Sequence, residues 1–495
     1  MIAFLFLSSG LFLGWSLGAN DAANIFGTAV GSRMLKFRTA AVIASIFIIL
    51  GAARSGSGTV HTISTLGNVN MAAGAFTVAL SAALVVYWMT RLSLPVSTSQ
   101  AIVGAIVGWN LFSGSLTDMH SLSRIAMTWI LSPLIAAGVS FLLYGAARII
   151  ISKIKIHVLT LDHYIRIGFV VAGAFGAYAL GANNIANVMG VFLSVSPFTM
   201  VHLGSLSVSS PEQLFFLGGV AIAAGVVSYS YRVMSTVGKS ILKLTPLSAL
   251  VVTIATGIVL FLFASESLEY WLASRGLPTF PLVPVSSSQA VVGAVIGIAL
   301  TRGGRGMDAA IVARISSGWV ITPILAGVVG FFSLFVIQNV FNQQVTAPVY
   351  YQVTAPCEEE LKRLNRWNRG LVAIRGKTFE SARNFDKALV DAGEKISLQV
   401  RDQALALGRL QKVRVKMVKL PAESVKNFLS PQQVSALKLF EGRSYSHAWQ
   451  LEAELASRDD SWKLKEVSVL NKQHNREIRL RIDFLLKHFS VKNKG

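Results

Sequence analysis

The chain has 495 residues, of which 53% are hydrophobic and only 14% are charged, and its mean hydropathy is +0.57. A soluble globular domain carries about 25% charged residues, so a soluble enzyme, a secreted disulfide scaffold and a disordered chain are excluded. The charge is unevenly distributed: residues 1–350 contain 17 Lys and Arg with 7 Asp and Glu, whereas residues 351–495 contain 28 and 17. The first part is therefore expected to lie in a membrane and the last part in water.

Apolar stretches that can cross about 30 Å of hydrocarbon recur along the first part, separated by short loops. We expect membrane spans near residues 1–17, 39–53, 71–90, 101–113, 125–151, 165–180, 213–230, 246–264, 290–300 and 309–341. Several are short or interrupted by Gly, Asn and Ser, which predicts broken helices, because unwound backbone is tolerated in a membrane only where it lines a cavity. The first stretch lacks a basic leader and a small-residue cleavage site, so it is predicted to be a retained helix.

Three sequence blocks occur twice in the same order. LGANDAANIFG at 17–27 matches LGANNIANVMG at 180–190, LPVSTSQAIVGAIVG at 94–108 matches VPVSSSQAVVGAVIG at 283–297, and RIAMTWILSPLIAAG at 124–138 matches RISSGWVITPILAGV at 314–328. Chance does not explain three ordered matches of this length. The sequence therefore predicts two homologous transmembrane repeats, residues 1–152 and 153–344, followed by a further domain at residues 345–495.

The basic residues indicate how the two repeats are oriented. Arg33, Lys36 and Arg38 follow the first span, and further basic loops follow the fifth, seventh and ninth spans, so these loops are expected to face the cytoplasm. Each repeat then has five spans, and this odd number means that the second repeat is inserted upside down. Secondary transporters are built in this way, with the substrate site at the membrane midplane where the halves meet. The same count puts the tail outside, whereas its basic charge favours the inside, so both sides stay open.

Residues 345–495 show the periodicity of amphipathic helices, for example at Leu361, Leu364, Leu371 and Val372, which recur among Lys and Arg. The sequence of this segment contains no metal-ligand cluster, phosphate loop or nucleophile constellation. Its basic excess is interpreted as a solvated helical surface, and no nucleic-acid partner is expected. We therefore predict a basic, soluble, mainly helical accessory domain.

Asp21 is the only acid of the membrane part that lies inside an apolar stretch away from the loops. An ionisable residue at that depth indicates a functional site. Asn20 and Asn24 beside it add carbonyl oxygens, the ligands that hard cations prefer, and flanking glycines would let the helix open around them. The alternatives are a buried Asp that caps a broken helix and a packing motif of small residues. The Asn-x-x-x-Asn core recurs as Asn183 and Asn187, which favours a cation site.

The second candidate site is a proline followed by a cluster of hydroxyl residues, once in each repeat. Proline begins a helix, and the backbone N–H groups of its first turn are free. Hydroxyls and amides converge there where the helix dipole is positive, which predicts an oxyanion site without a cationic side chain. Simple Ser and Thr caps are the alternative, but two copies, each followed by a Gly-x-x-x-Gly pair for close helix contact, favour the anion site. The residues are Ser97, Thr98, Ser99 and Gln100 with Ser286, Ser287, Ser288 and Gln289.

These duplicated motifs, GANDAAN and PVSTSQAIVGA, resemble those of the inorganic phosphate transporter (PiT) family of cation-coupled symporters. The likeness covers about residues 1–344, and the tail lies outside it. The resemblance implies an all-α polytopic membrane protein with two inverted-topology repeats, broken helices and re-entrant hairpins. It also implies a homodimer that carries phosphate with Na⁺ or, in some bacterial members, H⁺. It implies no enzyme activity and no cofactor.

By the same likeness, six residues fall on cation-site positions, where Na⁺ would bind: Asn20, Asp21, Asn24, Asn183, Asn184 and Asn187. Six fall on phosphate-contacting positions, with Gln100 and Gln289 beside them: Ser97, Thr98, Ser99, Ser286, Ser287 and Ser288. The second signature of the family usually reads Gly-Ala-Asn-Asp, so Asn184 leaves the second cation site without a carboxylate. The two glutamines stand where many members carry His or Thr.

We therefore expect a secondary active transporter in the cell (inner) membrane of a prokaryote, which moves inorganic phosphate by symport with a cation, Na⁺ first. A sulfate transporter of the same family is an alternative, because one branch of the family carries sulfate. A passive anion channel is the alternative from another class, since a pore would not need Asp21. A transporter-like receptor that signals through its tail is a third.

Overall fold

The structure is a computed structural model that describes residues 2–91, 96–154, 156–203, 206–237, 244–303, 309–392, 396–421, 425 and 428–491. The chain divides into two compact units. The first consists of residues 1–269 and 279–347, and the second of residues 270–278 and 348–495.

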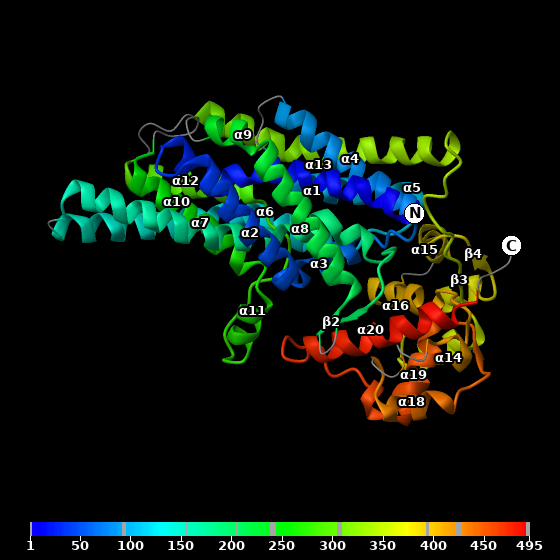
Figure 1. The fold of residues 1–495 in the computed structure, drawn as a ribbon. Helices are drawn as coiled ribbons and strands as arrows, with labels where there is room; N and C mark the ends of the chain where they lie inside the picture. Colours follow the sequence, from blue (N-terminus) through cyan, green and yellow to red (C-terminus); the bar gives the residue numbers. More distant parts are fainter. Residues whose placement is uncertain are drawn as a thin grey trace. The chain divides into compact units, whose positions relative to one another are not determined.

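The first unit is built almost entirely of α-helices (Figure 1). They are α1 (Ile2–Gly31), α2 (Phe37–Ser55), α3 (Ser57–Leu66), α4 (Ala72–Arg91), α5 (Thr98–Ser113), α6 (Met119–Lys153), α7 (Val158–Met189), η1 (Gly190–Phe192), α8 (Ser210–Ser228), α9 (Ser230–Val237), α10 (Pro246–Leu262), α12 (Ser287–Thr301) and α13 (Ala309–Asn339), with α11 (Glu266–Ala273) leading to the second unit. β1 (Val201–Leu203) and β2 (Leu206–Val208) form an antiparallel hairpin with Val201 opposite Val208. Each of the ten expected apolar stretches coincides with a helix. However, α5 and α12 have only 16 and 15 residues, so the expectation that stretches 101–113 and 290–300 span the membrane is wrong, because about 20 residues are needed.

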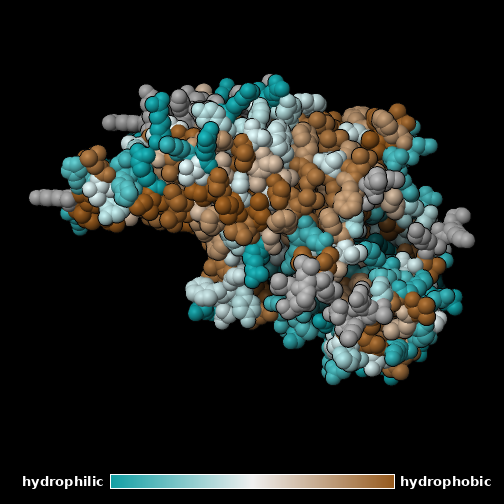
Figure 2. All heavy atoms as spheres, in the orientation of Figure 1, coloured by the Kyte–Doolittle hydropathy of each residue, from teal (hydrophilic) through white to brown (hydrophobic). Residues whose placement is uncertain are grey.

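Six of the helices in the described ranges are long and apolar enough to cross a membrane, or seven if α10 and α11, bent by 70°, form one span. Large hydrophobic side chains lie exposed on α6 and α13, such as Leu134 at 62% and Ile324 at 64%. Brown, hydrophobic spheres cover much of the visible face of this unit (Figure 2). An exposed apolar surface of this extent fits contact with lipid better than contact with water.

The packing of the first unit is reciprocal between the two sequence copies. α1 packs on α8 and α9, and its counterpart α7 packs on α2 and α3. α1 also packs on α4, as α7 does on α10. Each contact thus occurs twice, once with α1 and once with its counterpart α7, and the two versions differ only in that every helix is replaced by its counterpart. This is the contact pattern of a two-fold relation. The two copies are therefore interleaved, and neither forms a separate core.

The short helices α5 and α12 show the same exchange at closer range. α5 packs along α13 of the second copy, and α12 packs along α6 of the first. A Cβ atom at Gly104 would overlap the carbonyl oxygen of Pro323, and one at Gly293 would overlap that of Pro133. Only glycine fits at these two positions, so the close helix contact that the Gly-x-x-x-Gly pairs predict is confirmed.

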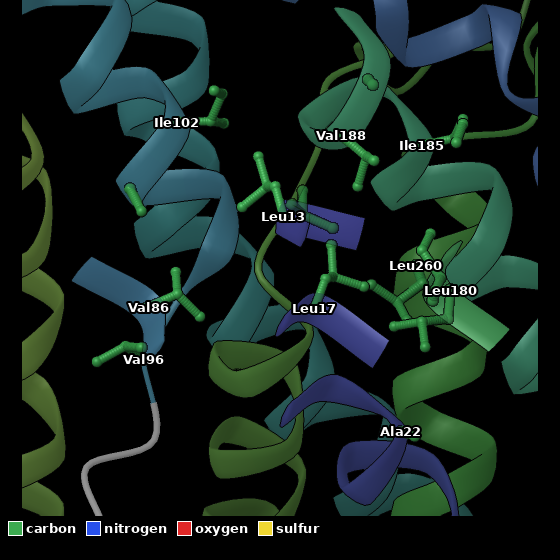
Figure 3. Packing of buried hydrophobic residues seen from close by; sticks show 14 of the residues in the cluster. Leu13, Leu17, Ala22, Val86, Val96, Ile102, Leu180, Ile185, Val188 and Leu260 are labelled. Atoms are coloured by element: carbon green, nitrogen blue, oxygen red, sulfur yellow. The ribbon is translucent and has the colours of Figure 1, made fainter. Parts of the chain in front are cut away.

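α1 runs through the middle of the hydrophobic core of this unit. Leu13 and Leu17 lie between Val86 and Ile102 of α4 and α5 on one side and the residues of α7, including Val188, on the other (Figure 3). Both leucines are completely buried. Packing on both sides thus fixes α1 about one helical turn before its polar motif.

The helices that carry the duplicated polar motif are not broken at it. α1 continues through Asn20 and Asp21, and α7 continues through Asn183, so the expectation that the helix opens there is wrong. The flanking glycine serves close packing instead, because a Cβ atom at Gly18 would overlap the carbonyl oxygen of Ile222 in α8. The helical path is interrupted between α8 and α9 and between α10 and α11.

The second unit contains two hydrophobic cores, each built around a two-stranded sheet. The first has β3 (Tyr351–Gln352), α14 (Ala355–Arg363), η2 (Arg369–Ile374), β4 (Thr378–Phe379), α15 (Ala382–Asp391) and α16 (Leu398–Gly408). The second has β5 (Val413–Arg414), η3 (Met417–Lys419), α18 (Pro431–Lys438), β6 (Ser444–Tyr445), α19 (Ala448–Arg458), η4 (Asp460–Trp462) and α20 (Lys472–Phe489). Both sheets are antiparallel, with Tyr351 opposite Phe379 and Val413 opposite Tyr445.

The two cores also share a short sequence pattern at the second strand of each sheet. GKTF begins at Gly376 and GRSY at Gly442, and both glycines have a positive φ, 73° and 82°. A helix starts three residues after the aromatic residue in each case. Of the apolar residues expected on a buried helical face, Leu361 and Leu371 are buried, whereas Leu364 and Val372 are exposed, at 40% and 55%.

The contact between α5 and α13 predicts that Gly104→Ala lowers the thermal stability of the protein. The added methyl group meets backbone that cannot yield easily, and overpacking of this kind costs about 1–3 kcal/mol. Gly138→Ala on α6 is the matched control, because its Cβ atom would meet no atom of the described residues within 4 Å. Thermal unfolding of the purified protein in detergent measures both, and equal Tm values would contradict the packing.

Candidate functional site

The two candidate sites of the sequence analysis form one site in the structure. The middle parts of α1 and α7 meet the first turns of α5 and α12, and hydrogen bonds join the four elements. All fourteen expected residues are buried, and Asn24 is the most exposed of them at 8%. We call this set the polar cluster: Asn20, Asp21, Asn24, Ser97, Thr98, Ser99, Gln100, Asn183, Asn184, Asn187, Ser286, Ser287, Ser288 and Gln289.

The carboxylate of Asp21 is held by one donor from each repeat. Asn20 Nδ2 donates to Asp21 Oδ1 at 2.8 Å, and the Ser287 hydroxyl donates to Asp21 Oδ2 at 2.9 Å. Asn20 lies on the same helix, whereas Ser287 lies in the first turn of α12. Hydrogen bonds to a charged acceptor are about twice as strong as neutral ones, so this carboxylate ties α1 to α12.

The amides of the Asn-x-x-x-Asn motifs also reach across to the opposite repeat. Asn24 Nδ2 donates to Ser287 Oγ at 2.9 Å and to Ser288 Oγ at 3.2 Å. In the same way, Asn187 Nδ2 donates to Ser99 Oγ at 2.8 Å. The amide motif of each repeat therefore faces the hydroxyl cluster of the other repeat.

Two backbone carbonyl groups complete the reciprocal pattern. Val96 O accepts hydrogen bonds from Asn20 Nδ2 at 3.4 Å and from the Ser288 hydroxyl at 3.1 Å. Its counterpart Val285 O accepts from the counterparts of both donors, at 2.8 and 3.3 Å. These carbonyls, and the Thr59 hydroxyl that donates to the backbone oxygen of residue 183 at 3.3 Å, were not predicted. A hydropathy pattern contains no signal for them, because Val96 and Val285 act through their backbone.

Two of the predicted hydroxyl residues are helix N-caps. Ser97 Oγ accepts the backbone N–H of Gln100 at 3.3 Å, and Ser286 Oγ accepts that of Gln289 at 3.2 Å. The cap alternative therefore holds for these two oxygen atoms, while the other hydroxyls lie inside the first turns of α5 and α12. Both turns carry the positive end of a helix dipole, which favours an anion. Pro95, expected to begin the first of these helices, lies outside the described residues.

Four buried oxygen atoms of the polar cluster have no hydrogen-bond partner among the residues that the structure describes. They are Thr98 Oγ1, Gln100 Oε1, Asn187 Oδ1 and Gln289 Oε1. Leaving a buried polar group unsatisfied costs about 1–3 kcal/mol, so four of them in one cluster indicate that something else binds there. Oxygen atoms can accept a proton from a ligand or coordinate a cation.

Asp21 carries the only formal charge in the polar cluster, which contains no Lys, Arg or His. In the described ranges, no group of three or more His, Cys, Asp and Glu side chains could hold a metal ion. The cluster thus offers one negative charge among neutral oxygen, hydroxyl and amide groups. A monovalent hard cation suits the carboxylate, and an anion beside it would depend on hydroxyls, helix dipoles and that cation.

Comparison of the whole chain with known proteins shows which family it belongs to. A family model described as the phosphate transporter family matches residues 17–269 and 276–475. The chain belongs to the phosphate transporter family. The match continues past residue 344, so the expectation that the tail lies outside the family pattern is wrong for much of it. With at least six apolar helices of spanning length, this member is an integral membrane protein.

Named relatives agree with this membership, and one solved structure is similar in fold. A protein of Pyrococcus furiosus named "Putative phosphate permease" is 29% identical over a gapped alignment of 395 residues, and the match covers 65% of this chain and 92% of that protein. "Inorganic phosphate transporter 2-1, chloroplastic" of Arabidopsis thaliana is 26% identical over a gapped alignment of 427 residues, and the match covers 65% of this chain and 70% of that protein. A structure described as "The sodium-dependent phosphate transporter" is similar in fold, with a TM-score of 0.55 and 22% identity over 68% of this chain and 99% of that chain.

The hydrogen bonds between the repeats predict that Ser287→Ala destabilises this family member. The substitution removes the donor to Asp21 and an acceptor for Asn24, and an unsatisfied buried group costs about 1–3 kcal/mol. Ser152→Ala is the control, because the Ser152 hydroxyl is exposed and donates only to Ile149 O on its own helix. Thermal unfolding in detergent should show a lower Tm for Ser287→Ala alone. Identical curves for the two variants would show that the bonds between the repeats contribute nothing.

Proposed function

We propose that this chain is a secondary active transporter that moves inorganic phosphate across a membrane by symport with Na⁺. The observation that carries the proposal is the single carboxylate of Asp21, buried where the amide motifs and hydroxyl clusters of both repeats meet. A buried charge is expensive in a membrane protein. It is understandable here if a cation binds to it during the transport cycle.

Na⁺ fits the amide and carboxylate groups of the polar cluster. Hard cations prefer oxygen ligands, and six side chains supply them at the positions that the family resemblance assigns to the cation: Asn20, Asp21, Asn24, Asn183, Asn184 and Asn187. The fold similarity to a protein described as sodium-dependent points to the same ion. A proton is the alternative, and it would need only Asp21.

Phosphate fits the hydroxyl groups of the polar cluster. Ser97, Thr98 and Ser99, and their counterparts 286–288, lie at two helix N-termini that favour an anion. The cluster also contains acceptors that could receive a proton from the ligand, namely the Asp21 carboxylate and the oxygens Gln100 Oε1 and Gln289 Oε1, which have no partner among the described residues. Phosphate carries a proton near neutral pH and sulfate does not. A site built to accept such a proton disfavours the ligand that lacks it.

Because both repeats contribute residues to the polar cluster, transport would involve movement of elements of one repeat against elements of the other. We propose that residues 1–152 and 153–344 are inverted-topology repeats, with α5 and α12 in re-entrant hairpins and the polar cluster near the midplane. Residues 345–495 would form the soluble, mainly helical accessory domain. A homodimer in the inner membrane of a prokaryote completes the proposal, the homodimer resting on the family resemblance.

The proposal predicts that Asp21→Asn abolishes phosphate uptake driven by a Na⁺ gradient. Removing one partner of a buried charge pair costs about 3–5 kcal/mol, so uptake should fall by at least about 100-fold. Asp162→Asn is the matched control, because Asp162 lies outside the polar cluster and forms a half-exposed ion pair with Arg166 at 2.7 Å. Both variants are purified, reconstituted in proteoliposomes and assayed with radiolabelled phosphate.

Imposing Na⁺ and pH gradients separately distinguishes the alternatives. Symport with Na⁺ concentrates phosphate only when the Na⁺ gradient is present, and excess sulfate should not compete. Accumulation driven by the pH gradient alone would replace Na⁺ by H⁺. Downhill flux without accumulation would identify a channel, and full uptake by a well-folded Asp21→Asn protein would refute the role of Asp21.

A further inference from the structure

The reciprocity of the polar cluster fails at one pair of positions. Asp21 and Asn184 are counterparts in the duplicated blocks, and so are Ser287 and Thr98. The Ser287 hydroxyl donates to Asp21 Oδ2 at 2.9 Å. Its counterpart Thr98 Oγ1 has no partner among the described residues, although Thr98 is only 1% exposed.

The hydrogen bonds of Asn184 account for this difference. Asn184 Nδ2 donates to Leu180 O on its own helix at 3.2 Å, and Asn184 Oδ1 accepts from Asn187 Nδ2 at 3.0 Å. Asn187 Oδ1 is left without a partner in the described part of the chain. The half of the cluster around Asp21 and Ser287 therefore has a carboxylate that accepts a hydrogen bond from Ser287. The half around Asn184 and Thr98 has two neutral oxygen atoms without a partner among the described residues, Thr98 Oγ1 and Asn187 Oδ1.

We propose that the two halves bind cations unequally: the half with Asp21 and Ser287 binds Na⁺ on its own, whereas the half with Asn184 and Thr98 binds a second Na⁺ only together with phosphate. This inference rests on the proposed function and concerns the order and coupling of binding at the same site. Asn184 is then the residue that makes the second cation dependent on the anion.

Charge balance is the physical reason for the inequality. Burying a cation among neutral oxygens alone is costly, because these ligands replace its water molecules but leave its charge uncompensated. Asp21 offsets that cost in the first half. In the second half, the negative charge must come from an anion bound beside Thr98 and Ser99, in the first turn of α5. Asn187 Oδ1, which has no partner among the described residues, supplies a ligand there but no charge.

Binding of the two ions must therefore be coupled in both directions. A coupling of ordinary size between two sites changes affinity by about 5- to 150-fold, and linkage requires the effect to be reciprocal. Phosphate should raise the affinity for the second Na⁺ by a factor in this range, and Na⁺ should raise the affinity for phosphate equally.

The test is a Na⁺ titration of the purified full-length protein at constant ionic strength, with and without inorganic phosphate. The native protein should bind one Na⁺ without phosphate and two with it. Asn184→Asp should bind two Na⁺ without phosphate, since it restores a carboxylate to the second half. Asn339→Asp is the matched control, because it adds the same charge at the exposed end of α13 and should behave like the native protein.

Equal Na⁺ binding by the native protein with and without phosphate would overturn the inference, and this result does not depend on any variant being folded. Unchanged Na⁺ binding by a folded Asn184→Asp protein would overturn the role of Asn184. Failure of the proposed function has a different signature. In that case a Na⁺ gradient would drive no phosphate uptake into proteoliposomes, whatever the titration shows.

Discussion

The burial of one carboxylate between two interleaved copies of the same sequence is the constraint on which the rest of the first unit depends. Asp21 can stay charged in the interior of a membrane protein only if donors surround it, and the donors come from both copies, Asn20 on α1 and Ser287 on α12. Neither repeat can build this site alone. The site therefore exists only when the two copies are packed together.

The close helix contacts follow from the same constraint. The first turns of α5 and α12 reach the middle of α1 and α7 because both short helices lie tightly against the proline-containing helices of the opposite copy. Gly104 and Gly293 allow this approach, since any side chain would overlap the backbone at Pro323 or Pro133. Gly18 does the same for α1 against α8. Small residues at helix contacts thus set the positions of polar side chains several residues away.

Much of this arrangement could be predicted from the sequence because it is duplicated. The repeat of Asn-x-x-x-Asn and of the hydroxyl clusters singled out the residues that the structure brings together, although their role as a transport site stays a prediction. The sequence does not reveal features that depend on the path of the backbone or on residues that become neighbours only in the folded protein. The unbroken course of α1 through Asp21 and the acceptor roles of Val96 and Val285 have no pattern in one dimension. The feature that the two cores of the second unit share, a two-stranded antiparallel sheet whose second strand is followed by a helix, was missed because only GKTF and GRSY mark it.

The most direct test of the account is to move the carboxylate from one repeat to its counterpart in the other, by combining Asp21→Asn with Asn184→Asp. If the two copies build one reciprocal site around a single charge, Thr98 takes the part of Ser287 as donor to that charge. Phosphate uptake driven by a Na⁺ gradient should then recover well above the level of Asp21→Asn alone. A correctly folded double variant that stays as inactive as Asp21→Asn would contradict the equivalence of the two halves.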